Sequence, residues 1–415
     1  MLNKIIWGVI FLSSFIHAEE VYNYTCEVKN KSCENNIKTS SNTIDNAKLK
    51  AFLSFSSSCE SIKVDDINCT ISEVYTTLNP ISVNSKNTLN HTIVDVLYGT
   101  DRALNSKAIL EERYTRKRDK LKFGVAQVSI PHSHVFGEIE RPFFDFNEKI
   151  GKDIVVIQLD DINKNKFSKL LQRKLGKVNK DDILIFIHGY NVTFPNAIRQ
   201  TAQLTYDLKF KGVPLTYSWT SQGGLAQYAK DEASVMYTIP KLVAFLEEVI
   251  NNKGKAKIHI LAHSMGTRAL ANALKDISYM YDSPQFKNVI LAAPDIDAEV
   301  FESNLYSKII KTTEKITIYT SSKDAALQLS HSVHDGKRLG EGGENISIFK
   351  DIVTIDASGL DTSFIGLGHS YFSQKEILVN DLRTLVHMSL PPQNRPNLLR
   401  KIKDKLFFWK FKVLE

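Results

Sequence analysis

Short apolar runs alternate with segments of helical spacing over most of the chain beyond residue 90. The run at 183–187 is unbroken, which is typical of a strand buried on both faces of a parallel sheet. The predicted strands are 93–98, 123–130, 154–159, 183–187, 213–219, 257–261, 288–292, 316–319 and 352–355. The predicted helices are 167–175, 196–208, 227–250, 267–279, 298–310 and 375–388. This alternation predicts an α/β fold whose mostly parallel sheet has helices on both faces.

The first 18 residues carry a different pattern. Lys4 precedes an apolar stretch that ends near Ala18, and that stretch is shorter than the ~20 residues needed to span a bilayer. We interpret residues 1–18 as a signal peptide cut after Ala18. The protein is therefore expected to be exported, either to a periplasm or out of the cell.

Residues 19–88 are rich in Asn, Ser, Thr and Lys and hold all the cysteines: Cys26, Cys33, Cys59 and Cys69. Their short apolar pieces could form only a small core. An even number of cysteines in an exported segment predicts two disulfides in a small accessory module, and three pairings stay open. Zinc is the weaker option, because no histidine lies between these cysteines and no Cys-x-x-Cys occurs.

The chain carries 53 Lys and Arg against 46 Asp and Glu, for a net charge of +7. These charges are scattered, so we expect no nucleic-acid partner. His132 and His134 lie near glutamates in a segment with loop signals, where solvated histidines are more common than metal ligands. No phosphate-binding loop has the required strand and helix around it. We therefore expect no metal and no cofactor.

The sequence 257–270 reads as a strand, a sharp turn and a helix, with Ser264 at the turn. A serine hydrolase presents its nucleophile on such a G-x-S-x-G turn. Here Ala262 replaces the first glycine and Gly266 keeps the second. The Met265 N–H would lie at the N-terminus of the following helix, where the free N–H groups stabilise negative charge.

The other predicted parts of a serine hydrolase site lie at the ends of further strands. His188-Gly189 ends the strand 183–187, and the Tyr190 N–H would then complete an oxyanion hole with Met265. We expect His188 to brace that loop by hydrogen bonding. Tyr217 and Trp219, at a neighbouring strand end, could line the substrate pocket, and core packing is an equal alternative for Trp219.

A catalytic serine needs a base and a carboxylate, expected in the order serine, acid, histidine. His369, in a glycine-flanked loop before the last helix, is the predicted base. Asp324 follows the next-to-last strand and is the preferred acid. Asp295 and Asp297 are the alternative, although Asp297 could instead cap the helix that starts at Ala298.

The chain resembles a bacterial α/β-hydrolase family of unknown function within the esterase/lipase superfamily, over about residues 94–386. The matching segments are 98–102, 128–131, 186–191, 217–219, 262–266, 291–295 and 368–371. The resemblance implies the α/β-hydrolase fold with Ser264, Asp324 and His369 as the triad. It also implies that the Tyr190 and Met265 N–H groups form the oxyanion hole.

The last segment, 391–415, lies outside this resemblance. Its apolar residues recur at helical spacing among several lysines. This pattern predicts a basic amphipathic tail that either lies on an anionic membrane surface or docks its apolar stripe on the domain.

These features predict a signal peptide (1–18), a cysteine-containing module (19–88), an α/β-hydrolase domain (89–390) and a basic tail (391–415). The expected function is serine hydrolysis of a small-molecule or lipid carboxylic ester through an acyl-enzyme, with possible peripheral membrane contact through the tail. The alternative is a non-catalytic binding or surface-interaction protein on the same scaffold. The sequence does not reveal the shape of the substrate pocket, which determines the acyl group that the enzyme accepts.

Overall fold

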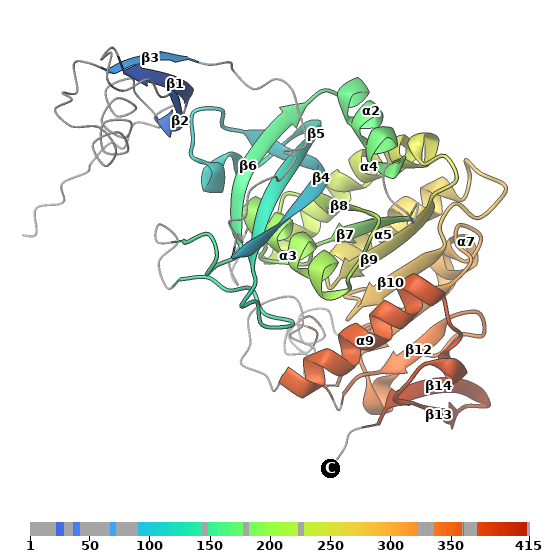
Figure 1. Cartoon of the computed structure of the whole chain (residues 1–415). Coiled ribbons are helices and arrows are strands. Elements are labelled where there is room, and N and C mark those ends of the chain that lie inside the picture. The colour runs from blue at the N-terminus through green and yellow to red at the C-terminus, as the bar shows by residue number, and fades with distance from the viewer. Residues whose placement is uncertain are drawn as a thin grey trace, which may run out of the picture. The chain divides into compact units, whose positions relative to one another are not determined.

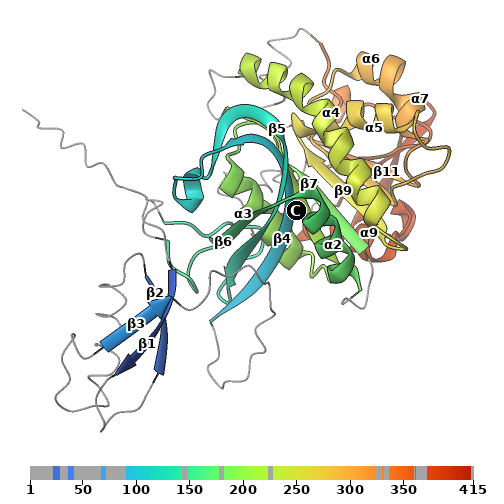
Figure 2. The same cartoon turned by 90° about the horizontal axis from the view of Figure 1, so that it is seen from above.

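The structure is a computed structural model. It describes residues 22–28, 36–41, 67–71, 90–142, 148–176, 182–222, 228–322, 327, 330, 336–358, 360 and 372–412. The chain divides into two compact units, Met1–Asn87 and Thr88–Glu415 (Figures 1 and 2).

The N-terminal unit contains a small antiparallel sheet in the order β2-β1-β3. Its strands are β1 (Tyr22–Val28), β2 (Asn36–Ser41) and β3 (Ile67–Ile71). The register sets Cys26 opposite Cys69, whereas Cys33 and Cys59 lie outside the described residues. Residues 1–18 also lie outside them. The disulfides and the signal peptide therefore stay predictions.

The described strands of the second unit form one sheet in the order β13-β14-β12-β11-β10-β9-β7-β8-β4-β5-β6. The strands from β4 through β8, β7, β9, β10, β11 and β12 to β14 pair in parallel, while β4-β5-β6 and β13-β14 pair antiparallel. Their bounds are β4 (His91–Leu104), β5 (Tyr114–Pro131), β6 (Val155–Ile162), β7 (Asp182–Ile187), β8 (Val213–Ser218), β9 (Lys257–His263), β10 (Asn288–Ala292), β11 (Ile316–Thr320), β12 (Val353–Asp356), β13 (Leu398–Lys403) and β14 (Leu406–Phe411). The predicted mostly parallel sheet is confirmed.

Helices cover both faces of this sheet, as Figures 1 and 2 show. They are α2 (Lys164–Leu175), α3 (Phe194–Asp207), α4 (Tyr228–Asn252), α5 (Gly266–Ile277), α6 (Ala298–Val300), α7 (Tyr306–Ile309) and α9 (Phe372–Met388), with a π-helical turn, η5 (Phe301–Leu305), between α6 and α7. Strand β7 shows how the layers are filled. Ile183, Ile185 and Ile187 join the core under α2, α4 and α5, whereas Leu184 and Phe186 join the core under α9. Alternate side chains of a strand point to opposite faces, so an unbroken apolar run is what a doubly covered strand requires.

No helix within the described ranges is both long enough and apolar enough to cross a bilayer.

The predicted helix in the C-terminal tail is wrong. Residues 398–411 form the hairpin β13-β14, and β14 extends the main sheet by pairing with β12. Asp404 and Lys405, at the hairpin turn, both have positive φ, as a type I′ turn requires. Phe407, Trp409 and Phe411 recur at every second position, and residues four apart satisfy this strand period as well as the helical one. Membrane contact by the tail stays a prediction, without the helix on which it was based.

The expectation of a solvated His134 is also wrong, because its side chain is only 3% exposed. Its Nδ1 lies 2.9 Å from Glu140, and its Nε2 lies 2.9 Å from Asp207 at the end of α3. Burial opposes the charge on His134, but the hydrogen bonds to the two carboxylates outweigh it and raise its pKa to about 9. The imidazolium therefore ties the loop after β5 to α3.

We predict that His134→Gln destabilises the protein at pH 6 and much less at pH 10. The folded pKa of about 9 lies above the ordinary value of 6.5. The stabilisation is therefore complete below about pH 6.5 and is lost as pH rises through 9, with a size of about 3 kcal/mol. Urea denaturation of the wild type and the variant at pH 6, 8 and 10 measures it, with the exposed His132→Gln as the control. A difference that does not change with pH would contradict this role.

Candidate active site

Ser264 lies on the turn between β9 and α5, where the parallel strands end. Its φ is 48°, in the left-handed region that costs a residue with a side chain about 1–3 kcal/mol. Two backbone hydrogen bonds hold the turn. The Ser264 N–H donates to the Ala292 carbonyl at 2.9 Å, and the Ser264 carbonyl accepts from the Thr267 N–H at 3.0 Å. Ser264 is 9% exposed. The fold thus holds Ser264 in a strained conformation at the edge of the sheet where α/β proteins bind ligands.

The loop after β7 lies directly against this turn. A Cβ on Gly189 would come within 3.1 Å of the Ser264 Cβ and within 2.8 Å of the His263 Nδ1. A Cβ on Gly266 would come within 2.3 Å of the His188 carbonyl oxygen. Both glycines are therefore required because two backbone turns touch, and the contact brings the Gly189-Tyr190 peptide next to Ser264.

His188 braces this loop, as the sequence predicts. Its Nδ1 lies 2.8 Å from the Gly189 carbonyl oxygen, and its own carbonyl accepts from the Trp219 Nε1 at 2.8 Å. Its ring stacks on the Trp219 ring with centroids 5.3 Å apart. Burial, with a further contribution from the Arg102 charge, lowers the pKa of His188 to about 3. His188 is therefore a neutral structural group at physiological pH.

Two N–H groups have the sequence positions that the prediction assigns to an oxyanion hole, those of Met265 and Tyr190. Met265 is buried and immediately precedes α5, so its N–H has no acceptor within that helix. Tyr190 follows Gly189 in the loop that contacts Ser264, and its ring packs on the Tyr228 ring at 5.7 Å between centroids. Their role as the oxyanion hole belongs to the proposal below.

Asp295 lies beside the turn at residues 262–266 that carries Ser264, called the elbow below. Its carboxylate already accepts hydrogen bonds from other side chains. Its carboxylate accepts from the Tyr228 hydroxyl at 2.7 Å, from Ser330 at 2.6 Å, and from Arg268 and Arg338 at 3.0 Å each. Burial opposes ionisation here, but Arg268 and Arg338 outweigh it and hold the pKa of Asp295 below its usual value. No histidine is among these four donors from the described residues. Asp295 thus anchors the elbow to its surroundings.

Asp297 caps α6, because its Oδ1 accepts from the Glu299 and Val300 N–H groups at 3.0 Å each. This is the capping role that we gave as its alternative. Asp324 and His369 lie outside the described residues, so their roles stay predictions.

Tyr217 and Trp219 are fully buried in the main core. The Tyr217 hydroxyl lies 2.8 Å from the Thr238 hydroxyl, and Trp219 supports the loop at His188. Their positions therefore give no support to the prediction that they line a substrate pocket.

Sequence reasoning missed two groups of buried charges around the elbow. One is the cluster on Asp295, whose arginines come from α5 and from a loop 43 residues beyond Asp295. The other is centred on Arg102, which is fully buried at the end of β4. The segment Tyr98–Arg102 is one of those that carry the family resemblance. The pair Asp101-Arg102, which follows an apolar strand, could have indicated buried charges at this strand end.

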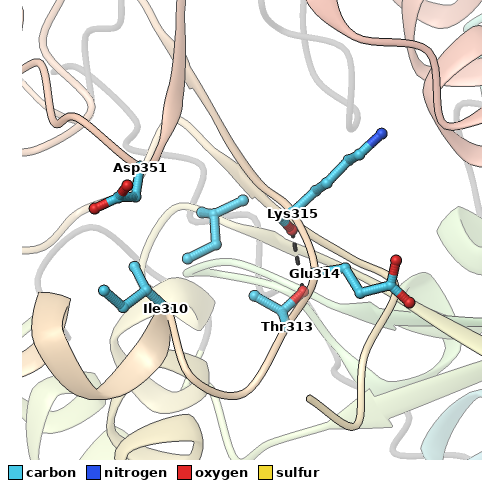
Figure 3. Close-up of a pocket in the computed structure, with 6 residues that line it drawn as sticks. Ile310, Thr313, Glu314, Lys315 and Asp351 are labelled. Carbon is cyan, nitrogen blue, oxygen red and sulfur yellow. Dashed lines mark hydrogen bonds between the residues drawn. The ribbon is translucent and has the colours of Figure 1, made fainter. Parts of the chain in front are cut away.

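A hollow elsewhere on the unit lies at the opposite edge of the sheet. It is lined by Ile310, Thr313, Glu314, Lys315, Ile316 and Asp351. In Figure 3 the Thr313 hydroxyl donates to the Lys315 carbonyl, at 3.1 Å. These residues surround the start of β11, whereas Ser264 follows the end of β9, which lies two strands away in the parallel order β11-β10-β9. This hollow is therefore separate from the elbow.

We predict that Gly266→Ala lowers the free energy of unfolding by about 1–3 kcal/mol, because the new methyl group would overlap the backbone of β7 and push α5 away from it. Gly176→Ala is the matched control, since its nearest atom lies 3.7 Å away and the effect should stay within about 0.5 kcal/mol. Urea denaturation measures both. Equal stabilities for the two variants would show that the turns are not in contact.

Known proteins match this chain at low sequence identity. Over 144 residues the chain is 25% identical to an uncharacterized protein of Nostoc sp.. The alignment covers 29% of this chain and spans about a third of that protein's length. Among solved structures, a cold-adapted esterase from an Arctic intertidal metagenomic library is 12% identical, with a TM-score of 0.31 over 66% of this chain and 89% of that one. A fungal esterase from Rhizomucor miehei is 8% identical, with a TM-score of 0.31 over 71% and 83%.

A family model described as "Alpha/beta hydrolase of unknown function (DUF900)" matches residues 163–387, which is more than half of the chain. The match includes the loop at Gly189, the elbow at Ser264 and most of the parallel strands. The chain therefore belongs to this family of α/β-hydrolases of unknown function.

Proposed function

We propose that this α/β-hydrolase is an exported serine hydrolase that cleaves carboxylic esters of a small molecule or a lipid. The observation that carries the proposal is the strained Ser264, held at φ 48° against the backbone of Gly189. Strain of this kind persists only where the surroundings enforce it, and it recurs at catalytic turns.

In the proposed reaction the Ser264 hydroxyl attacks the ester carbonyl while His369 takes its proton. The oxygen of the tetrahedral intermediate accepts hydrogen bonds from the Tyr190 and Met265 N–H groups. His369 then gives the proton to the leaving alcohol, and water activated by the same histidine releases the acid from the acyl-enzyme. Asp324 holds His369 in the required tautomer.

Asp324 is proposed as the acid because Asp295 and Asp297 are engaged elsewhere. Asp295 already receives four donors, among them two arginines, and Asp297 caps α6. A carboxylate neutralised by two arginines would do little to stabilise an imidazolium. The export of the protein rests on residues 1–18 and on the clustered cysteines.

We predict that a fluorophosphonate probe labels the wild type, that Ser264→Ala abolishes labelling, and that His369→Ala weakens it greatly. The probe reacts with a serine only when a neighbouring base and an oxyanion hole activate it. Ser303→Ala, in an exposed segment, is the matched control and should label normally. An ester series from short to long acyl chains would then define specificity. A folded wild type that takes no label would favour a non-catalytic binding protein on this scaffold.

For the acid, we predict that Asp324→Asn lowers kcat by about 10³–10⁴-fold with little loss of stability, because the wrong histidine tautomer would predominate. Asp295→Asn should instead lower the free energy of unfolding by about 3–5 kcal/mol, since it leaves Arg268 and Arg338 without their counter-charge. Ester kinetics and urea denaturation separate the two effects. The reverse assignment would follow if Asp295→Asn produced the large loss of kcat.

A further inference from the structure

A directed chain of hydrogen bonds runs from Arg102 to the loop that contacts Ser264. The Arg102 Nε donates to the Ser218 Oγ at 3.0 Å, and that oxygen lies 3.2 Å from the His188 Nε2. The His188 Nδ1 in turn lies 2.8 Å from the Gly189 carbonyl oxygen. Four residues from three separate segments, β4, β8 and the loop after β7, thus form one continuous path.

With His188 neutral, these hydrogen-bond partners assign its ring proton to Nδ1. A guanidinium can only donate and a carbonyl oxygen can only accept, so the Nδ1 of His188 carries a proton and donates to Gly189. Because burial keeps His188 neutral, its Nε2 accepts the hydroxyl proton of Ser218. Every donor in the chain therefore points from Arg102 towards the Gly189 carbonyl.

The end of this chain is chemically linked to the proposed oxyanion hole. The carbonyl of Gly189 and the N–H of Tyr190 belong to one planar peptide group, in which the two bonds point in opposite directions. A hydrogen bond that fixes the carbonyl also fixes the direction of the N–H. It draws electron density from the peptide as well, which makes the N–H a stronger donor.

Arg102 is placed to strengthen this effect. It is fully buried, and the charges of Asp101 and Asp231 favour its protonated form. Burial lowers its pKa to about 10, so it keeps its charge at neutral pH. Its other nitrogens donate to the carbonyls of Val192, at 2.7 Å, and Ser221, at 3.3 Å. One guanidinium therefore holds the loop after β7 directly at Val192 and, through Ser218, at His188, and it supplies positive charge to the chain of hydrogen bonds.

We infer that Arg102, acting through Ser218 and His188, is a positioning residue that orients and polarises the Tyr190 N–H towards the oxyanion formed at Ser264. This inference rests on the proposed function. A purely structural role for Arg102 would involve the same contacts with Val192 and Ser221, but it would not require the directed path through Ser218.

Ser218→Ala tests the inference, because it interrupts the chain and leaves Arg102 and His188 in place. On a soluble ester we expect kcat to fall about 10-fold while KM changes less than about 2-fold, since the lost stabilisation appears only in the transition state. Affinity for a boronic acid analogue should fall in parallel. Thr216→Val is the matched control, because it also removes a buried β8 hydroxyl, one that donates to the Phe186 carbonyl at 3.2 Å. It should change neither quantity.

A second readout does not depend on activity. In protein labelled with ¹⁵N-tyrosine, the Tyr190 amide proton, assigned by its absence in Tyr190→Phe, should shift upfield in Ser218→Ala and stay in place in Thr216→Val. If Ser218→Ala does not fold, Ser218→Cys replaces it, with a smaller change in the same direction because a thiol is a weaker donor.

Equal kinetics for Ser218→Ala and Thr216→Val, or an unmoved Tyr190 amide, would overturn the inference. A loss confined to KM would also overturn it, since it would indicate a binding role. If the wild type shows no ester hydrolysis, the proposed function fails, and the amide shift alone still decides whether Arg102 polarises the loop.

Discussion

The direct contact between two backbone turns is the constraint on which the candidate site depends. Gly189, after β7, lies against the Cβ of Ser264, and Gly266, at the start of α5, lies against the carbonyl of His188. Neither contact leaves room for a side chain. Because β7 and β9 are adjacent parallel strands, their ends meet at one edge of the sheet, and the contact follows from the topology.

Buried polar groups hold these turns from both sides. Arg102 and His188 fix the loop after β7, whereas Asp295, with Arg268 and Arg338, surrounds the elbow. Burying such charged and polar groups costs free energy, and well-placed partners are needed to offset that cost. A site that stabilises charge in a transition state benefits from dipoles already fixed in direction, because no reorganisation is then needed during the reaction. The strain at Ser264 and the buried charges around it are parts of one preformed arrangement.

Much of the second unit could be predicted because its strands and helices differ in period. For the strand at 183–187 and the elbow at Ser264, the residues that determine the local structure are adjacent in the sequence, so the pattern alone predicts them. The errors arose where the deciding partner was distant or the period ambiguous. His134 is buried because Asp207, 73 residues further on, binds it, and nothing near His134 indicates that contact. In the tail, the aromatic residues from Phe407 to Phe411 satisfy both periods, and pairing with β12 favours the strand.

The most direct test of the account is a crystal structure of the protein after reaction with an alkyl phosphonate. The account predicts phosphorus bonded to the Ser264 Oγ, with the phosphonyl oxygen about 2.7–3.1 Å from both the Tyr190 and Met265 nitrogens. It also predicts that the Gly189 carbonyl keeps its hydrogen bond to His188. Phosphorus on another residue, or a phosphonyl oxygen turned away from Tyr190, would contradict the central claim that the contact between the two turns forms the catalytic site.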